Sequence, residues 1–144
     1  MEDENSLKRI LAIDFGLKRI GLALSDPLAI FAYPFKTILN DKNLWNELTK
    51  VILDNSVRKI VLGLPKKENG DPSTLTKEVL KFKNQLEEKF NLEIVLVDER
   101  YSSLIAHEMV IESVTKKSKR KEKGLIDKNA AAVILQDYLD GKHY

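Results

Sequence analysis

Residues 9–25 read RILAIDFGLKRIGLALS, two apolar runs with a short turn between them. In the first run the apolar residues are consecutive, so they would lie on both faces of a strand, which is typical of a central strand covered on both sides. Only the turn GLK separates the runs, so the second run should pair with the first as an antiparallel hairpin. The stretch therefore predicts a buried central strand that ends on a carboxylate, Asp14.

The rest of the chain alternates between strand and helix patterns. Pro34 in the third predicted strand places that strand at a sheet edge. The two later strands each follow a helix, so they should run parallel to the first strand. We expect an α/β fold, a mixed five-stranded sheet in which a three-strand antiparallel meander is joined by two parallel strands and flanked by helices, as in the ribonuclease H-like fold. The predicted strands are 9–15, 19–25, 31–38, 58–64 and 92–97, and the predicted helices are 41–56 with Asp41 as N-cap, 73–90, about 102–114, and 127–140.

Length and composition favour one soluble domain over residues 1–144, with its core at about 9–140. The 144 residues are 43% hydrophobic and 32% charged, and they include no cysteine, which excludes disulfides and thiolate metal sites. No apolar run approaches the roughly 18 residues that span a bilayer, and the acidic N-terminus does not resemble a signal peptide. We expect a cytoplasmic protein without a membrane partner.

Positive charge is concentrated in one segment, KKSKRKEK at residues 116–123. This segment carries a charge of +5, whereas the whole chain carries +2, so the remainder is mildly acidic. Such a distribution favours a local anionic partner, although charge runs are commonly only solvated loops. The basic residues are Lys116, Lys117, Lys119, Arg120, Lys121 and Lys123.

Acidic residues stand at three separated points that the predicted fold could bring together. Asp14 ends the first strand, Asp98 and Glu99 follow the last strand, and Asp127 opens the last helix. The carboxyl ends of parallel strands meet at one sheet edge, where α/β proteins place ligands. Clustered carboxylates repel one another, and a Mg²⁺ ion relieves that repulsion. Two such ions could activate water and stabilise the leaving oxygen of a phosphodiester.

Each of these carboxylates also has a purely structural explanation. Asp14 could start a turn and Asp127 could be an N-cap only. Strand alternation puts Asp98 and Glu99 on opposite faces, so at most one of them reaches the site. We favour Glu99 because its side chain is longer, with Asp98 then holding Arg100 or a water.

Four ordered blocks, AIDFGLKRIGLALSDP, VLGLPKKENGDPS, VDERYSS and IDKNAAAVILQDYL, resemble the YqgF/RuvX family over nearly the whole chain. Members of this family are known as Holliday-junction resolvases and as pre-16S ribosomal RNA nucleases. The resemblance implies a ribonuclease H-like fold, Mg²⁺ or Mn²⁺ as cofactor, and a nucleic-acid partner, either a ribosomal RNA precursor or branched DNA. It places the acidic positions of the family on Asp14, Asp98 or Glu99, and Asp127, and its basic positions on Lys18, Arg19 and Arg100.

Two other functions remain open at this point. A non-catalytic RNA-binding factor for ribosome assembly would use the fold and the basic segment without the carboxylates. The stretch DFGLKRIGLALSD also resembles the phosphate loop of actin-like ATPases, but those proteins bind ATP between two such domains, so ATP would require a dimer here. A homodimer is also what a two-fold symmetric DNA junction would demand, whereas trimming of RNA needs no such symmetry.

Overall fold

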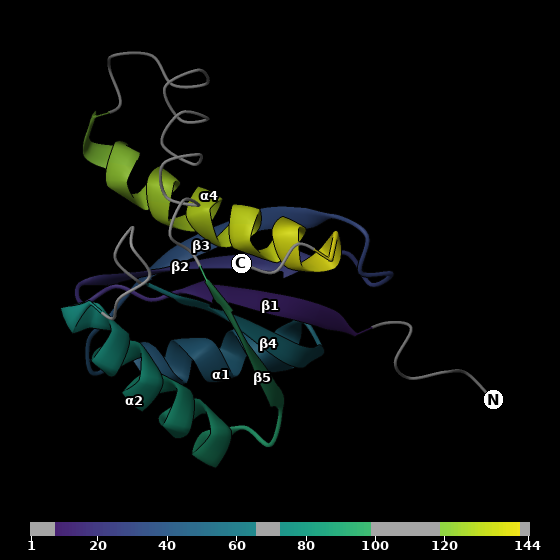
Figure 1. Cartoon of the computed structure of the whole chain (residues 1–144), viewed down its shortest axis with the longest axis horizontal. Helices are drawn as coiled ribbons and strands as arrows, with labels where there is room; N and C mark the ends of the chain where they lie inside the picture. The colour runs from purple at the N-terminus through teal and green to yellow at the C-terminus, as the bar shows by residue number, and fades with distance from the viewer. Residues whose placement is uncertain (1–7, 66–72, 99–118, 142–144) are drawn as a thin grey trace.

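The structure is a computed structural model that describes residues 8–65, 73–98 and 119–141, and of residues 119–127 the backbone alone. Five strands and three helices lie in these ranges (Figure 1). The strands are β1 (Arg9–Asp14), β2 (Arg19–Ser25), β3 (Ala32–Leu39), β4 (Val57–Leu64) and β5 (Glu93–Asp98). The helices are α1 (Leu44–Asp54), α2 (Thr74–Lys89) and α4 (Lys119–Leu139).

The strands form one mixed sheet in the order β3-β2-β1-β4-β5. β1 pairs antiparallel with β2 and parallel with β4, and β5 continues the parallel half. The predicted meander, the central position of the first strand and the parallel direction of the later strands are therefore confirmed. β4 lies between β1 and β5, so β5 is an edge strand and not a neighbour of β1.

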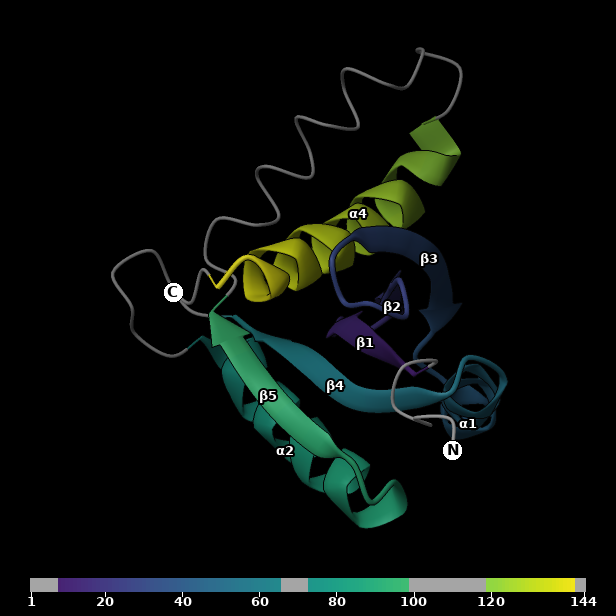
Figure 2. The same cartoon turned by 90° about the vertical axis from the view of Figure 1, so that its right-hand side faces the viewer.

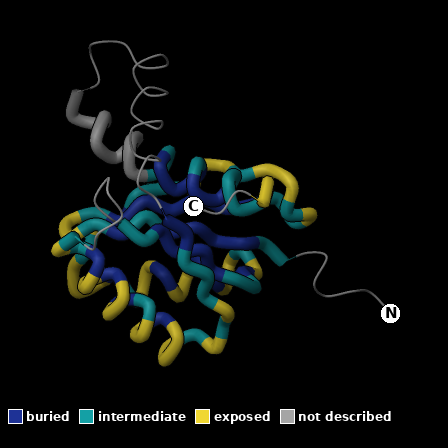
Figure 3. The backbone as a smooth tube through the Cα atoms, in the orientation of Figure 1, coloured by how far each residue is buried: buried dark blue, intermediate teal, exposed yellow. Residues whose placement is uncertain are grey.

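Helices cover both faces of the sheet, with α1 and α2 on one side and α4 on the other (Figure 2). We call these sides the α1/α2 face and the α4 face. Leu11 and Ile13 of β1 pack with the buried residues of α1 and α2, whereas Ile10 and Ala12 pack with those of α4. β1 is thus buried on both faces, as its consecutive apolar residues predict, and Figure 3 shows the buried backbone concentrated in these strands.

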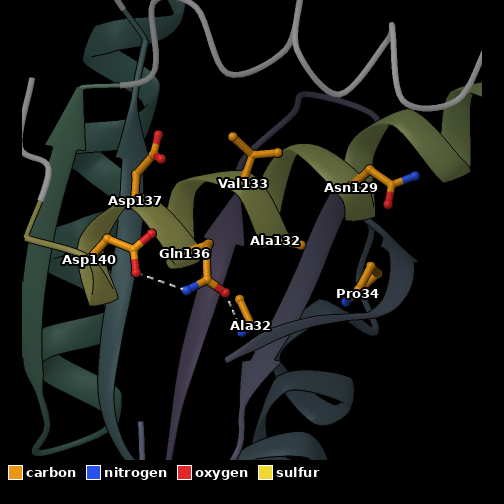
Figure 4. Close-up of a pocket in the computed structure, with 8 residues that line it drawn as sticks. All are labelled: Ala32, Pro34, Asn129, Ala132, Val133, Gln136, Asp137 and Asp140. Atoms are coloured by element: carbon orange, nitrogen blue, oxygen red, sulfur yellow. Dashed lines mark hydrogen bonds between the residues drawn. The ribbon is translucent and has the colours of Figure 1, made fainter. Parts of the chain in front are cut away.

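The edge strand β3 is held to α4 by one glutamine. Gln136 accepts a hydrogen bond from the Ala32 amide at 2.8 Å and donates one from Nε2 to Asp140 (Figure 4). Its Nε2 also donates to the Ile30 carbonyl. Pro34 lies in this strand, as predicted for an edge, and the register with β2 shifts beside it. These contacts tie the C-terminal half of α4 to the sheet.

Two sequence predictions about the helices are wrong. The last helix begins at Lys119 and not at residue 127, because KRKEK consists of good helix formers and Gly124 does not interrupt the helix. Position 127 is therefore inside α4 and not at its N-terminus, and positions 119–121 and 123 lie on a helix and not in a loop. The N-cap of α1 is Asn43, and Asp41 instead accepts the Asn43 amide at 2.9 Å.

The helix predicted over about 102–114 lies outside the described residues. Among the helices that are described, none is long and apolar enough to cross a bilayer.

Candidate catalytic edge of the sheet

Asp14 lies at the carboxyl end of the central strand, on the α4 face. It occupies the same side of β1 as Ile10 and Ala12, which pack against α4, and it is only partly buried. On β2 its register partner is Gly21. On β4 the pairing of Ile13 with Leu62 puts Gly63 beside it. Gly21 and Gly63 share this face with Ala23 and Val61, so neither neighbouring strand carries a side chain next to the Asp14 carboxylate.

In the turn after Asp14 the backbone at Gly16 lies close to the carbonyl group of Arg19. A Cβ atom at Gly16 would collide with the carbonyl oxygen of Arg19, so the position excludes every other residue in this conformation. Asn40, which follows β3, fastens the turn with two hydrogen bonds of 2.9 Å. Its side-chain Nδ2 donates to the Gly16 carbonyl, and its backbone amide donates to the Lys18 carbonyl.

Two predicted basic residues come from this same turn. Lys18 is exposed at the turn, and Arg19 is partly buried at the start of β2. Arg19 lies two residues before Gly21 and therefore on the α4 face, beyond Asp14 toward the edge. The structure thus brings Asp14, Lys18 and Arg19 together at one edge of the sheet.

Asp98 reaches the same edge from β5 but lies on the opposite face. Ile94 and Leu96, its neighbours by alternation, pack on the α1/α2 face, and Asp98 itself is only 6% exposed. Because β4 separates β5 from β1, the backbones of β1 and β5 are roughly 10 Å apart. Asp98 is therefore poorly placed to share an ion with Asp14 on the α4 face. Glu99 and Arg100 lie outside the described residues.

The direction of α4 decides which of its turns lie toward the carboxyl edge of the sheet. Near the end of the helix, Tyr138 accepts a hydrogen bond from Lys59 at the beginning of β4 at 3.0 Å, a contact that raises the pKa of Lys59. α4 therefore runs opposite to β4, and its earlier turns extend toward the carboxyl edge (Figure 1). The eleven residues from position 127 to Tyr138 rise about 16 Å. The strand from Lys59 to Gly63 rises about 13 Å, so α4 is long enough for backbone position 127 to reach the level of Asp14.

Other predicted site residues are not placed by the structure. Lys116 and Lys117 lie outside the described residues, and Lys119, Arg120, Lys121 and Asp127 are described by backbone only. Within the described part of the chain, no group of three His, Cys, Asp or Glu side chains is close enough to hold a metal. Of the three expected ligands Asp14, Glu99 and Asp127, the structure describes the side chain of Asp14 alone. For position 127 it describes the helix backbone.

Three residues of this edge were not singled out by the sequence. Asn40 contacts the turn across 24 residues of chain, a pairing that no local pattern reveals. Gly21 and Gly63 each occur in a strand pattern, where an isolated glycine often marks a close approach of another group. That signal was available, but their position beside Asp14 required the register of the sheet.

Two relatives match this chain over more than nine tenths of its length. A protein of Sulfurihydrogenibium sp. (strain YO3AOP1), named "Putative pre-16S rRNA nuclease", is 42% identical over 138 residues, covering 93% of this chain and 91% of its own. A protein of the same name from Desulforamulus reducens (strain ATCC BAA-1160 / DSM 100696 / MI-1) is also 42% identical, over 134 residues, covering 92% of this chain and 96% of its own.

Two solved structures share the fold at low sequence identity. RuvC of T. thermophilus in complex with a Holliday junction substrate has a TM-score of 0.55 at 12% identity, covering 94% of this chain and 98% of its own. Fowlpox virus resolvase with Holliday junction DNA has a TM-score of 0.54 at 13% identity, covering 92% of this chain and 97% of its own. The predicted ribonuclease H-like fold is therefore confirmed. The family model RuvX, described as Holliday junction resolvase, matches residues 8–141, and the chain belongs to the RuvX family.

Proposed function

We propose that this protein is a metal-dependent nuclease that cleaves phosphodiester bonds of structured nucleic acid at the carboxyl edge of its sheet. The observation that carries the proposal is Asp14, a carboxylate at the end of the central strand, with Gly21 and Gly63 on the strands beside it. Lys18 and Arg19 at the same edge supply positive charge for the phosphates. The names of the relatives and of the family support the same activity.

The chemistry of the proposed ligands fits Mg²⁺ or Mn²⁺. Asp14, Glu99 and Asp127 would hold the ion through oxygen atoms only, which these hard cations prefer. When bound, the ion supplies a polarised water and charge stabilisation at the leaving oxygen. Asp14 would be the ligand that the central strand contributes, and Lys18 and Arg19 would bind the phosphates of the substrate at the same edge.

Two substrates are compatible with this site, and the relatives and the family model are named for different ones. The curated relatives are named for the pre-16S ribosomal RNA, whereas the family model is named for the Holliday junction. RNA processing would let a monomer act alone. Resolution of a junction would require a homodimer, with one such edge from each copy.

A parallel cleavage assay tests the proposal. The purified chain is incubated with a pre-16S ribosomal RNA fragment and with a four-way DNA junction, each with Mg²⁺, with Mn²⁺ and with EDTA. We expect metal-dependent cleavage of one substrate and none with EDTA. Tight binding of RNA without cleavage of either substrate would favour the RNA-binding assembly factor, and cleavage that persists in EDTA would remove the metal from the mechanism.

A further inference from the structure

A hollow opens beside the proposed catalytic edge, on the α1/α2 face. It has a volume of about 370 Å³ and lies between the β1–β2 turn, the start of α1 and one side of α2. Small-molecule sites are commonly about 300–1,000 Å³, so its size suits a ligand of a few rings at most. No residue proposed above for metal or phosphate binding lines it.

Three aromatic residues contribute to the lining of this hollow. Phe15, Trp45 and Phe82 line it, and their rings are packed together, with centroids 4.8 Å apart for Phe15 and Phe82 and 5.3 Å for Trp45 and Phe82. Trp45 is only partly buried, whereas the two phenylalanines belong to the buried core. Trp45 therefore presents part of its ring at an open cavity, with the Lys89 ammonium 5.0 Å from the ring centroid, and a stacked nucleobase would take the place of that ammonium.

The rim is polar and does not suit a phosphate. Asp41 and Glu78 contribute two carboxylates against the single ammonium of Lys81, so the net charge of the rim is negative. Gln85 adds an amide, and Asn40 uses its Nδ2 on the Gly16 carbonyl, which leaves its Oδ1 as an acceptor. Carboxylates and amide oxygens accept hydrogen bonds from the amino and imino groups of a base.

The hollow is one residue away from the catalytic edge. Asp14 faces α4, and the next residue, Phe15, faces the hollow, so the two sites lie on either side of one turn. The turn carries exposed Lys18, and Leu17 at the lip of the hollow is 65% exposed. A nucleotide held at the turn by its phosphate could extend its base over this lip.

We propose that the hollow binds one unpaired nucleobase of the substrate, next to the phosphodiester bond that is cleaved. This inference rests on the proposed nuclease function and adds to it a requirement for single-stranded character at the cleavage site. A base in a duplex is stacked and paired, so its edge cannot enter a hollow lined by Trp45.

Trp45 provides a direct test because it is the only tryptophan of the chain. Its fluorescence is titrated with single-stranded oligoadenylate of six nucleotides, in EDTA so that no cleavage occurs, while the anisotropy of a labelled copy of the same RNA reports total binding. We expect saturable quenching with the same midpoint as the anisotropy. A blunt RNA duplex should bind through its phosphates with little quenching.

Variants separate the hollow from general binding. Gln85→Ala and Leu17→Ala, both at exposed positions, should raise the RNA concentration at half-maximal quenching roughly threefold to tenfold. Asn84→Ala, an exposed amide on the same helix that does not line the hollow, should leave it unchanged.

The outcomes distinguish this inference from the function on which it rests. Anisotropy that reports tight binding while Trp45 fluorescence stays constant would overturn the base site and leave the nuclease proposal standing. Equal effects of Gln85→Ala and Asn84→Ala would overturn it as well. Absence of oligoadenylate binding by both readouts would also overturn the base site, whereas the cleavage assay described above decides the nuclease proposal by itself.

Discussion

Position 16 requires glycine because a Cβ atom there would be too close to the Arg19 carbonyl oxygen, and not because of its backbone angles. Among the described residues the glycine with a positive φ is Gly141, so a left-handed conformation does not explain Gly16. The constraint is the Arg19 carbonyl, which occupies the space that a Cβ would need. The sequence predicts a tight turn at this glycine, but only the structure shows which atom excludes a side chain.

Gly16→Ala should therefore lower the free energy of unfolding by about 1–3 kcal/mol, the usual cost of forcing extra atoms into a packed position. Urea denaturation followed by circular dichroism measures this loss. Leu17→Ala, at an exposed position of the same turn, is the control and should change stability by less than about 0.5 kcal/mol. Equal stability of the two variants would show that the turn relaxes freely.

Asp26 is a second residue with a defined local role. Its Oδ1 accepts the amides of Ile30 and Phe31 at 2.7 and 2.8 Å, and the hydrogen bond from Phe31 is the largest cause that lowers the pKa of Asp26 below its usual 3.8. A carboxylate with a lowered pKa stabilises the fold above its unfolded pKa, and that stabilisation is lost as the pH falls through the lower, folded value.

Asp26→Asn keeps the shape but removes the charge, so the variant should be less stable than the parent at about pH 6, and this difference should shrink as the pH falls through the lowered pKa of Asp26. Denaturant midpoints of both proteins across this range give the difference directly. A difference that is the same at every pH would mean that the charge of Asp26 contributes nothing.

The alternation of side chains along β5 favours Glu99 over Asp98 as the metal ligand. Val95 and Val97 contact the core on the α4 face, and Ile94 and Leu96 contact the opposite core. Asp98 continues the second set and therefore lies on the face opposite Asp14, which disfavours Asp98 as a ligand shared with Asp14. The sequence predicts that Asp98 and Glu99 alternate between the two faces of the sheet. It does not predict on which of these faces Asp14 lies.

Glu99→Gln should abolish cleavage, and Asp98→Asn should retain most of it. Both changes preserve size and remove one charge, so each is the matched control of the other. Rates under identical metal and substrate concentrations decide the order. Loss of activity in Asp98→Asn with retention in Glu99→Gln would reverse the assignment.

The start of α4 changes what is expected of the basic segment. Lys119, Arg120 and Lys121 are consecutive backbone positions of a helix, and successive helical positions lie about 100° apart, so the three positions do not share one helix face. The sequence suggested a loop because Gly124 and Asp127 read as the end of a connection and the start of a helix. Helix propensity of the lysine-rich run outweighs the cost of about 1 kcal/mol for one internal glycine.

Replacing Lys119, Arg120 and Lys121 with alanine should lower the salt dependence of nucleic-acid binding. Each lost phosphate contact removes about 0.9 from the slope on duplex DNA or about 0.7 on single strands, so one or two contacts predict a change of roughly one to two units. The matched control is Lys50, Lys77 and Lys83 to alanine, on α1 and α2. An identical slope in both triple variants would leave the basic segment without a role in binding.

For the whole molecule, the order of elements along the chain was enough to predict the sheet. The consecutive apolar residues of β1, the short hairpin and the two crossover helices leave few ways to arrange five strands. The position of β5 at an edge, with β4 between it and β1, depends on pairing between distant segments and could not be read locally. The same holds for the glycines beside Asp14, which become neighbours only through the register.

The central claim is that Asp14 holds the cation that cleavage requires, and one measurement tests it most directly. Mn²⁺ binding, followed by electron paramagnetic resonance, and cleavage are compared in the parent, in Asp14→Asn and in Asp54→Asn, which changes a carboxylate at the end of α1. We predict that Asp14→Asn loses both Mn²⁺ binding and cleavage while its circular dichroism and unfolding midpoint stay close to those of the parent, and that Asp54→Asn retains both. Cleavage by Asp14→Asn within about twofold of the parent, a difference of only about 0.4 kcal/mol in the barrier, would contradict the claim.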